Sequence, residues 1–171
     1  LVFSASPRCQ IVPLPSSQVA FAIDGTERLR WHASADSPRP FFFPLTGPSG
    51  IPLTRMGHPG APDHDHHRSV WFAHHKVAGN NFWADTTGTQ IRQTQWMAYD
   101  DGDDEARMAV QLEWFGESNS QRLIKQDLFV AVAPAPSGGL FVELQTSLRS
   151  VEDTLELEQT NFGLVALRHS F

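Results

Sequence analysis

The sequence predicts an all-β chain that folds as an antiparallel β-sandwich or a related barrel, and three observations carry this prediction. Aromatic residues are frequent, with 12 Phe and 5 Trp, and Pro and Gly each occur 12 times, which is typical of short strands joined by turns. Apolar and polar residues alternate with a period of two in several segments. No window shows the sustained period of 3.6 residues that an amphipathic helix requires. We therefore expect about nine strands and no helix longer than about ten residues.

The first half of the chain shows its strands between clear turn signals. Residues 18–23 alternate apolar and polar, Asp24-Gly25 is a two-residue hairpin signal, and residues 26–31 form the returning strand. The apolar run at residues 41–43 is short enough for a buried strand. Residues 56–68 are rich in Gly and Pro and have the composition of a loop, after which the next strand is expected to begin.

The second half of the chain has the pattern of an antiparallel meander. Residues 89–99 form one expected strand, and the acidic turn at residues 100–105 lacks the spacing of a calcium-binding EF-hand loop. Apolar residues alternate with polar ones along residues 108–114. Residues 122–132 and 140–149 are expected to form a hairpin around a turn rich in Pro and Gly.

Charge and composition argue against several classes of function. The formal net charge is −6 and no run of Lys or Arg occurs, so neither nucleic acid nor a membrane surface is an expected partner. No apolar stretch approaches the roughly 20 residues of a transmembrane helix. The single cysteine, Cys9, excludes an internal disulfide and a cysteine-based zinc site.

One domain is expected, with a short segment before it. Residues 1–16 are interpreted as an N-terminal arm or the remnant of a processed leader, because the chain opens at Leu1 rather than Met. Residues 17–171 are expected to form the β-sandwich, cut short at its C-terminal end, because the chain stops within the apolar run 162–171. The sequence does not distinguish a cytoplasmic from an exported protein.

A histidine-rich segment between residues 58 and 75 is the most informative feature for function. It contains six of the eight histidines. Imidazoles and carboxylates are costly to bury unless each finds a partner, so a structural core does not need such a cluster. Groups that titrate near neutral pH suit proton transfer or metal binding. We therefore expect at least three of the following side chains to converge on one solvent-reachable pocket: His64, His66, His67, Arg68 and His74.

The leading hypothesis is an enzyme that acts on a carbohydrate or a sugar derivative by histidine acid–base chemistry. His66 or His67 is the expected general base, because an imidazole with an ordinary pKa of about 6.5 can accept a proton near neutral pH. His64 or His74 is the expected acid. Asp63 is expected to orient an imidazole by accepting its N–H hydrogen bond.

Five further residues are candidates for binding the substrate. Arg68 offers a planar, charged group to a substrate oxygen or to a developing negative charge. Trp71, Asn80, Phe82 and Trp83 combine flat aromatic faces with an amide, which suits a ring with one apolar face such as a sugar. Epimerisation, mutarotation, elimination and hydrolysis are all compatible with these side chains. No cofactor is expected.

Two alternative functions remain open. In a metal-dependent β-sandwich enzyme, a divalent ion such as Zn would be bound by His64, His66 and His67. His-x-His spacing is a weak signal by itself, however, and the cupin and metallo-β-lactamase patterns are not met. In a non-catalytic carbohydrate-binding module, the three aromatic residues named above would bind the sugar and the histidines would have no role.

Four segments carry a family resemblance, which extends from about Val19 to the end of the chain. They are residues 39–45, 48–54, 62–74 and 79–83, and the most specific part is the run His64-x-His66-His67-Arg68 followed by Trp71-Phe72. Together they resemble a bacterial family of unknown function that carries the label methane oxygenase PmoA. The label is not expected to describe the activity, because a membrane methane monooxygenase subunit needs transmembrane helices.

The resemblance implies a soluble β-sandwich akin to the mutarotase-like supersandwich of sugar-acting proteins. Members of the family are longer than this chain and tend to occur in carbohydrate-catabolic settings. The chain departs from the family pattern at Asp65, where Pro is usual, and at Ser69 and His75, where Gly is usual. Asn161-Phe162 also replaces a more polar pair, so any contribution of that pair to activity is absent here.

Overall fold

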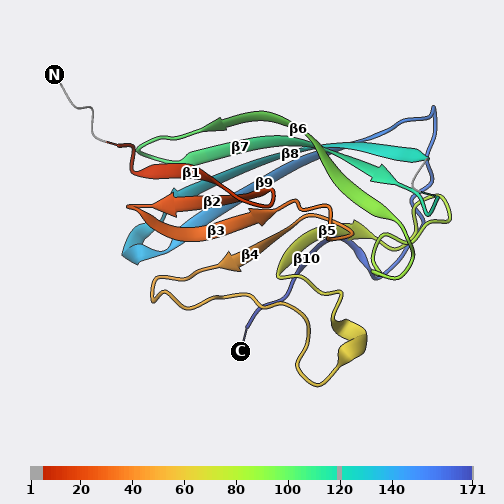
Figure 1. The fold of residues 1–171 in the computed structure, drawn as a ribbon, viewed down its shortest axis with the longest axis horizontal. Helices are drawn as coiled ribbons and strands as arrows, with labels where there is room; N and C mark the ends of the chain where they lie inside the picture. Colours follow the sequence, from red (N-terminus) through yellow and green to blue (C-terminus); the bar gives the residue numbers. More distant parts are fainter. Residues whose placement is uncertain (1–5, 119–120, 171) are drawn as a thin grey trace.

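The structure is a computed structural model that describes residues 6–118 and 121–170. Within these ranges ten strands form two antiparallel sheets, which confirms the expected all-β sandwich (Figure 1). The six-stranded sheet contains, in spatial order, β1 (Cys9–Leu14), β2 (Gln18–Ile23), β3 (Thr26–His32), β4 (Phe41–Leu45), β5 (Val70–His74) and β10 (Gly163–Leu167). The four-stranded sheet contains β6 (Gln90–Asp100), β7 (Ala106–Phe115), β8 (Arg122–Pro134) and β9 (Leu140–Ser150).

Helical structure in the described ranges is limited to two three-residue 3-10 turns, η1 (Pro62–His64) and η2 (Pro136–Gly138). No helix in this part of the chain has the length and apolar character needed to cross a membrane. The absence of a long helix is what the period-two patterning predicts.

The main core lies between the two sheets and follows the alternation of the strands. On β7, Met108, Val110 and Leu112 are buried, and the residues between them are more exposed. Their partners on β8 include Val130 and Leu128, which belong to the same apolar cluster. Successive side chains of a strand point to opposite faces, so this pattern places one face of the four-stranded sheet against the six-stranded sheet.

The first strand corrects the expected domain boundary. β1 lies inside the segment 1–16 that was interpreted as an arm, yet it pairs with β2 along its whole length. Cys9 and Ile11 alternate with more exposed residues and are buried in the main core. The sandwich therefore begins before residue 17, while residues 1–5 lie outside the described ranges.

The fifth strand separates two apolar clusters because its side chains alternate between the faces of the sheet. Val70 and Phe72 join the main core between the sheets. Trp71 and Ala73 point to the other face, where they form a second buried cluster with Phe41 of β4. The six-stranded sheet thus has an inner face in the main core and an outer face, and the outer face carries this second cluster.

A long loop between β4 and β5 returns to the outer face of the sheet (Figure 1). Its two arms pair with each other through hydrogen bonds from Gly57 N–H to the His67 carbonyl, 2.7 Å, and from Ser69 N–H to the Arg55 carbonyl, 2.9 Å. The pairing holds the intervening residues 58–66 as a tip. The histidine-rich segment therefore begins in this tip and ends in β5.

Candidate functional site

Turn residues give the loop tip its shape. Ala61 N–H donates to the His58 carbonyl over 3.1 Å, which closes a four-residue turn with Pro59 and Gly60 in the middle. Proline fixes the backbone angle of the second turn position, and glycine supplies the positive φ of the third, here 78°. The turn leads directly into η1, whose last residue is His64.

The histidine side chains of the tip form a chain of ring contacts. His64 lies 4.9 Å from His67 and 6.3 Å from His66, measured between ring centroids. His66 and His67 meet edge to face at 4.4 Å. His67 then stacks on Trp71 at 5.6 Å, which ties the loop to the outer face of the sheet. Three of the predicted histidines are therefore neighbours, and one of them is buried against a tryptophan.

A cavity of about 490 Å³ opens between the loop tip and a second loop at residues 84–86. The predicted site residues that line it are His66, Arg68 and Asp63. The remaining lining residues are Pro62, Asp65, Ala84, Asp85 and Thr86. Of the five side chains expected to share one pocket, only His66 and Arg68 line this cavity, fewer than the expected three; His64 and His67 contact the ring of His66 and do not line it.

One carboxylate joins two arginines at the floor of the cavity. Asp85 Oδ2 accepts a hydrogen bond from Arg68 Nη2 at 2.6 Å, and its other oxygen accepts one from Arg39 Nη2 at 2.5 Å. Arg39 is 1% exposed and also donates to the carbonyls of Phe82 and Trp83. The Cζ of Arg68 lies 5.4 Å from the ring centre of Phe41. This network fixes Asp85 and Arg68 at the cavity with both charges paired.

Asn81 explains why the second loop presents Asp85 to the cavity. Its side-chain oxygen accepts hydrogen bonds from the backbone N–H groups of Trp83, at 2.9 Å, and Ala84, at 3.2 Å. Its carbonyl accepts a hydrogen bond from the Thr87 hydroxyl at 2.6 Å. An asparagine that bonds the backbone two residues ahead is a typical turn former. Asp85, Arg39 and Asn81 were not among the predicted site residues, although a carboxylate two residues after a tryptophan in a polar loop was visible in the sequence.

Burial keeps two imidazoles neutral at physiological pH. It lowers the pKa of His66 below its ordinary value, an effect that the nearby charge of Asp85 partly opposes. Burial also lowers the pKa of His67 to about 4, with additional lowering by the neighbouring His66 and by Arg168. A neutral imidazole can accept a proton, so both residues are in the state that a general base requires. Only His66 lines the cavity.

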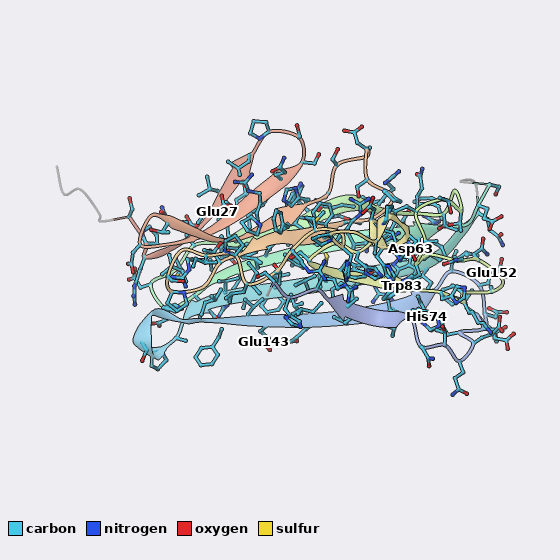
Figure 2. All side chains as sticks on the ribbon, turned by 90° about the horizontal axis from the view of Figure 1, so that it is seen from below. Glu27, Asp63, His74, Trp83, Glu143 and Glu152 are labelled. Carbon is cyan, nitrogen blue, oxygen red and sulfur yellow. The ribbon has the colours of Figure 1, made fainter. Side chains whose placement is uncertain are left out.

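His64 and Asp63 form a second pair at the rim of the cavity. Nδ1 of His64 lies 3.1 Å from a carboxylate oxygen of Asp63, and both side chains are well exposed. Asp63, which was predicted to orient an imidazole, therefore lies within hydrogen-bond distance of one. In the view of Figure 2, Trp83 lies between Asp63 and His74.

The structure places five other predicted site residues away from the cavity lining. His74 lies on the inner side of β5, and its Nε2 is 3.1 Å from the Glu158 carbonyl. Asn80 holds a turn by donating to the Ala78 carbonyl at 3.0 Å. Phe82 is 1% exposed in the main core, and Trp71 is 1% exposed beneath His67. Trp83 is partly buried against the second apolar cluster. Strand alternation explains His74, because it shares a face with Phe72 rather than with Trp71.

The possible metal ligands are not grouped around a common site in the described residues. Across residues 6–118 and 121–170, no three His, Cys, Asp or Glu side chains are arranged to hold one metal ion. The ring contacts of the tip histidines are close, but their nitrogen atoms do not surround a common point as tetrahedral coordination requires. Binding there would need the tip to rearrange.

Comparison with known proteins gives a family and no activity. A family model described as a family of unknown function (DUF6807) matches residues 18–170. Neither the curated proteins nor the solved structures contain a match to the chain. The matched range includes both loops of the cavity and nine of the strands in full. The chain therefore belongs to the family of unknown function DUF6807.

Proposed function

We propose that this chain is the catalytic domain of an enzyme that transfers protons on a carbohydrate or a sugar derivative. The observation that carries the proposal is the cavity in which the neutral imidazole of His66 lies beside the paired charges of Arg68 and Asp85. A volume of about 490 Å³ suits a ligand of the size of a sugar ring or two. Carboxylates and guanidinium groups are good hydrogen-bond partners for several hydroxyl groups at once.

His66 is the proposed general base. Its lowered pKa leaves it unprotonated at neutral pH, so it can accept a proton from a hydroxyl group or from a carbon atom next to a carbonyl. Arg68 lies beside it and supplies positive charge where an oxygen atom becomes negative in the transition state. Asp85 keeps Arg68 in place by accepting its hydrogen bond.

His64, paired with Asp63, is the proposed second proton carrier. It is more exposed than His67, with 41% of its side chain accessible, so it can exchange protons with water and return one to the product. Mutarotation, epimerisation and elimination each need a base and an acid within reach of the substrate. His66 in the cavity and His64 at its rim, paired with Asp63 of the lining, would provide them for all three reactions.

One experiment tests the proposal across these reaction types. A panel of aldoses, ketoses and sugar acids is incubated with the protein in deuterated water and followed by proton NMR. Mutarotation appears as faster exchange between anomers, epimerisation as deuterium incorporation at carbon, and elimination as new alkene signals. We expect one of these signals with the native chain and a loss of at least about 100-fold with His66→Gln.

His58→Gln is the matched control, because His58 belongs to the same loop tip and is exposed outside the cavity lining. This variant is expected to keep the native rate. Equal activity of the His66→Gln variant and the native chain would contradict the proposed role of His66. Stoichiometric zinc, manganese or iron retained by the purified protein, with activity lost on chelation, would replace the proposal with the metal-dependent alternative.

A second candidate, a carbohydrate-binding module, is favoured by a different surface. The aromatic residues first considered for stacking include Trp71 and Phe82, which are each 1% exposed and offer no free ring face. Trp96 and Tyr99 instead are 40% and 53% exposed and line a groove of about 220 Å³ near β1. Glycan binding that is lost in Trp96→Ala and kept in His66→Gln would support this candidate.

A further inference from the structure

Two arginines lie next to the histidine cluster without a carboxylate partner. The carbonyl of Arg168 accepts a hydrogen bond from Arg55 N–H at 3.0 Å, and Arg168 N–H donates to the Ser69 carbonyl at 2.6 Å. The carbonyl of Arg55 in turn accepts from Ser69 N–H at 2.9 Å. This ladder places both arginines beside the end of the loop that carries His67.

The charges of these arginines are not neutralised by the residues around them. No ion pair within the described residues includes Arg55 or Arg168. The side chain of Arg55 donates only to the carbonyls of His169 and Gly57. By contrast, Arg39 and Arg68 share the carboxylate of Asp85. In a chain with net charge −6, two adjacent unpaired arginines leave a local excess of positive charge.

Buried polar atoms without partners gather at the same place. Nε1 of Trp71, which is 1% exposed, and Nδ1 of His67, which is 9% exposed, have no hydrogen-bond partner, and neither does Nε of Arg168. The ring centroids of His67 and Trp71 are 5.6 Å apart. Trp71 pairs with Ala166, two residues before Arg168, so Trp71 and Arg168 extend from the same face of the sheet. Buried donors normally find a partner, and a bound acceptor would provide one here.

We propose that Arg55 and Arg168, beside the buried rings of His67 and Trp71, form a binding subsite for an oxyanion, a carboxylate or a phosphate group, near the cavity of His66. An oxyanion accepts several hydrogen bonds and supplies the negative charge that this region lacks. Guanidinium groups bind such groups through two parallel N–H donors. The positive charges of Arg55 and Arg168 also disfavour protonation of His67. This effect is expected where no carboxylate of the protein compensates the two arginines and a bound anion would do so.

The subsite also narrows the proposed substrate class. His67, next to the subsite, touches His66 of the cavity at 4.4 Å between ring centroids, so the subsite and the cavity are neighbours through this pair of rings. The substrate is therefore a sugar acid or a sugar phosphate, with its charged group at the arginines and its hydroxyl groups at the cavity. This identification of the substrate rests on the proposed function, whereas binding of an oxyanion does not.

Calorimetric titration of the full chain at low ionic strength tests the subsite. The probes are sodium glucuronate, glucose 6-phosphate and uncharged glucose. We expect at least one charged sugar to bind tenfold or more tightly than glucose, with a weaker affinity in high salt. The difference between glucuronate and glucose 6-phosphate shows whether the subsite prefers a carboxylate or a phosphate group.

Two variants and one control assign the binding to the arginines. Arg168→Gln is expected to remove the preference for charged sugars. Arg168→Lys keeps the positive charge but cannot offer two parallel donors, so it is expected to lose most of the affinity for charged sugars. Arg28→Gln is the matched control, because Arg28 also donates only to carbonyl groups, those of Thr46 and Gly138. It is expected to bind as the native chain does. Circular dichroism establishes that each variant is folded.

Three outcomes overturn the subsite or separate it from the proposed enzyme. Charged sugars that bind no better than glucose, or equally well in folded Arg168→Gln, overturn the subsite. Turnover of neutral sugars without anion binding overturns the subsite and leaves the proton-transfer proposal standing. Anion binding that depends on Arg168, with no turnover of any charged or neutral sugar, supports the subsite and overturns the proposed enzyme.

Discussion

The inner and outer faces of the six-stranded sheet differ in how they treat buried polar groups. In the main core that the inner face lines, the indole N–H groups of Trp31 on β3 and of Trp114 on β7 of the facing sheet donate to glutamine side chains at 2.8 Å. On the outer face, Trp71 and His67 each carry a buried nitrogen atom without a partner. An unpartnered buried donor costs about 1–3 kcal/mol. The two core indoles are therefore satisfied, and His74 Nδ1 is an unpartnered atom on the inner side of β5. The outer face keeps several such atoms close together, as is expected of a surface that binds a ligand.

The arginines show a second contrast, between side chains that have a carboxylate of their own and side chains that share one or have none. Arg122 and Arg30 form ordinary ion pairs with carboxylates at the surface of the sandwich. At the outer face, one carboxylate is shared between Arg39 and Arg68, and Arg168 has none. Each prediction below tests whether the inner face governs stability and the outer face governs function.

The largest effect is expected at the inner face. Trp114→Ala removes a side chain that is 1% exposed and leaves the buried Gln126 without its donor. We expect the free energy of unfolding to fall by about 4 kcal/mol, measured by urea denaturation. Trp96→Ala is the matched control, because Trp96 is 40% exposed, and its cost is expected to be about 1 kcal/mol or less. Equal losses in the two variants would contradict the assignment of the core.

Asp85→Asn is expected to have the next largest effect, and it would reduce both stability and activity. The change leaves Arg39, which is 1% exposed, without its counter-charge, and breaking a buried ion pair costs about 3 kcal/mol. Asp24→Asn removes a carboxylate from the exposed pair with Arg8 and is expected to change stability little. If urea denaturation gave the two variants the same midpoint, the outer-face network would not be a buried one.

The pH dependence of stability should report on His67. In the folded chain its pKa is lowered to about 4 from the ordinary 6.5, so between these values the unfolded chain binds a proton that the folded chain excludes. Stability is therefore complete above pH 6.5 and decreases as the pH falls towards 4. We expect His67 to account for about 1–2 kcal/mol of this loss, since solvent near the loop tip reduces the full effect. Thermal unfolding of His67→Gln, compared with the native chain from pH 7 to pH 4, should show a flatter profile, and identical profiles would refute the assignment.

The smallest effect compares a turn of the sandwich with the tip of the histidine-rich loop. Gly25 and Gly60 have positive φ angles of 74° and 78°, and a Cβ atom at either position would meet nothing within 4 Å. Alanine at each position should therefore cost only backbone strain, about 1 kcal/mol. Equal losses in urea denaturation would show that the loop unfolds together with the sandwich. A much smaller loss for Gly60→Ala would show that the loop opens independently of the sheets.

Local signals were sufficient to predict most of the strands. The Asp24-Gly25 turn joins β2 to β3, and the alternation at residues 108–114 matches the buried face of β7. The sequence also located the histidine-rich loop and the neighbouring contacts of His64, His66 and His67. It misplaced the start of the domain because β1 is short and its alternation is interrupted by Pro13.

The sequence by itself determined the fold class and the chemistry available in one loop, because period-two patterning and turn residues act over a few neighbouring positions. Only the tertiary structure decided which groups share the cavity. Asp85 meets Arg39 across 46 positions of sequence and Arg68 across 17, and Arg168 reaches the loop only because β10 pairs with β5. Those contacts depend on strand order and loop packing, which no local pattern encodes. Strand alternation then directed His74 to the inner side of the sheet, whereas His66, in the loop before β5, lines the cavity.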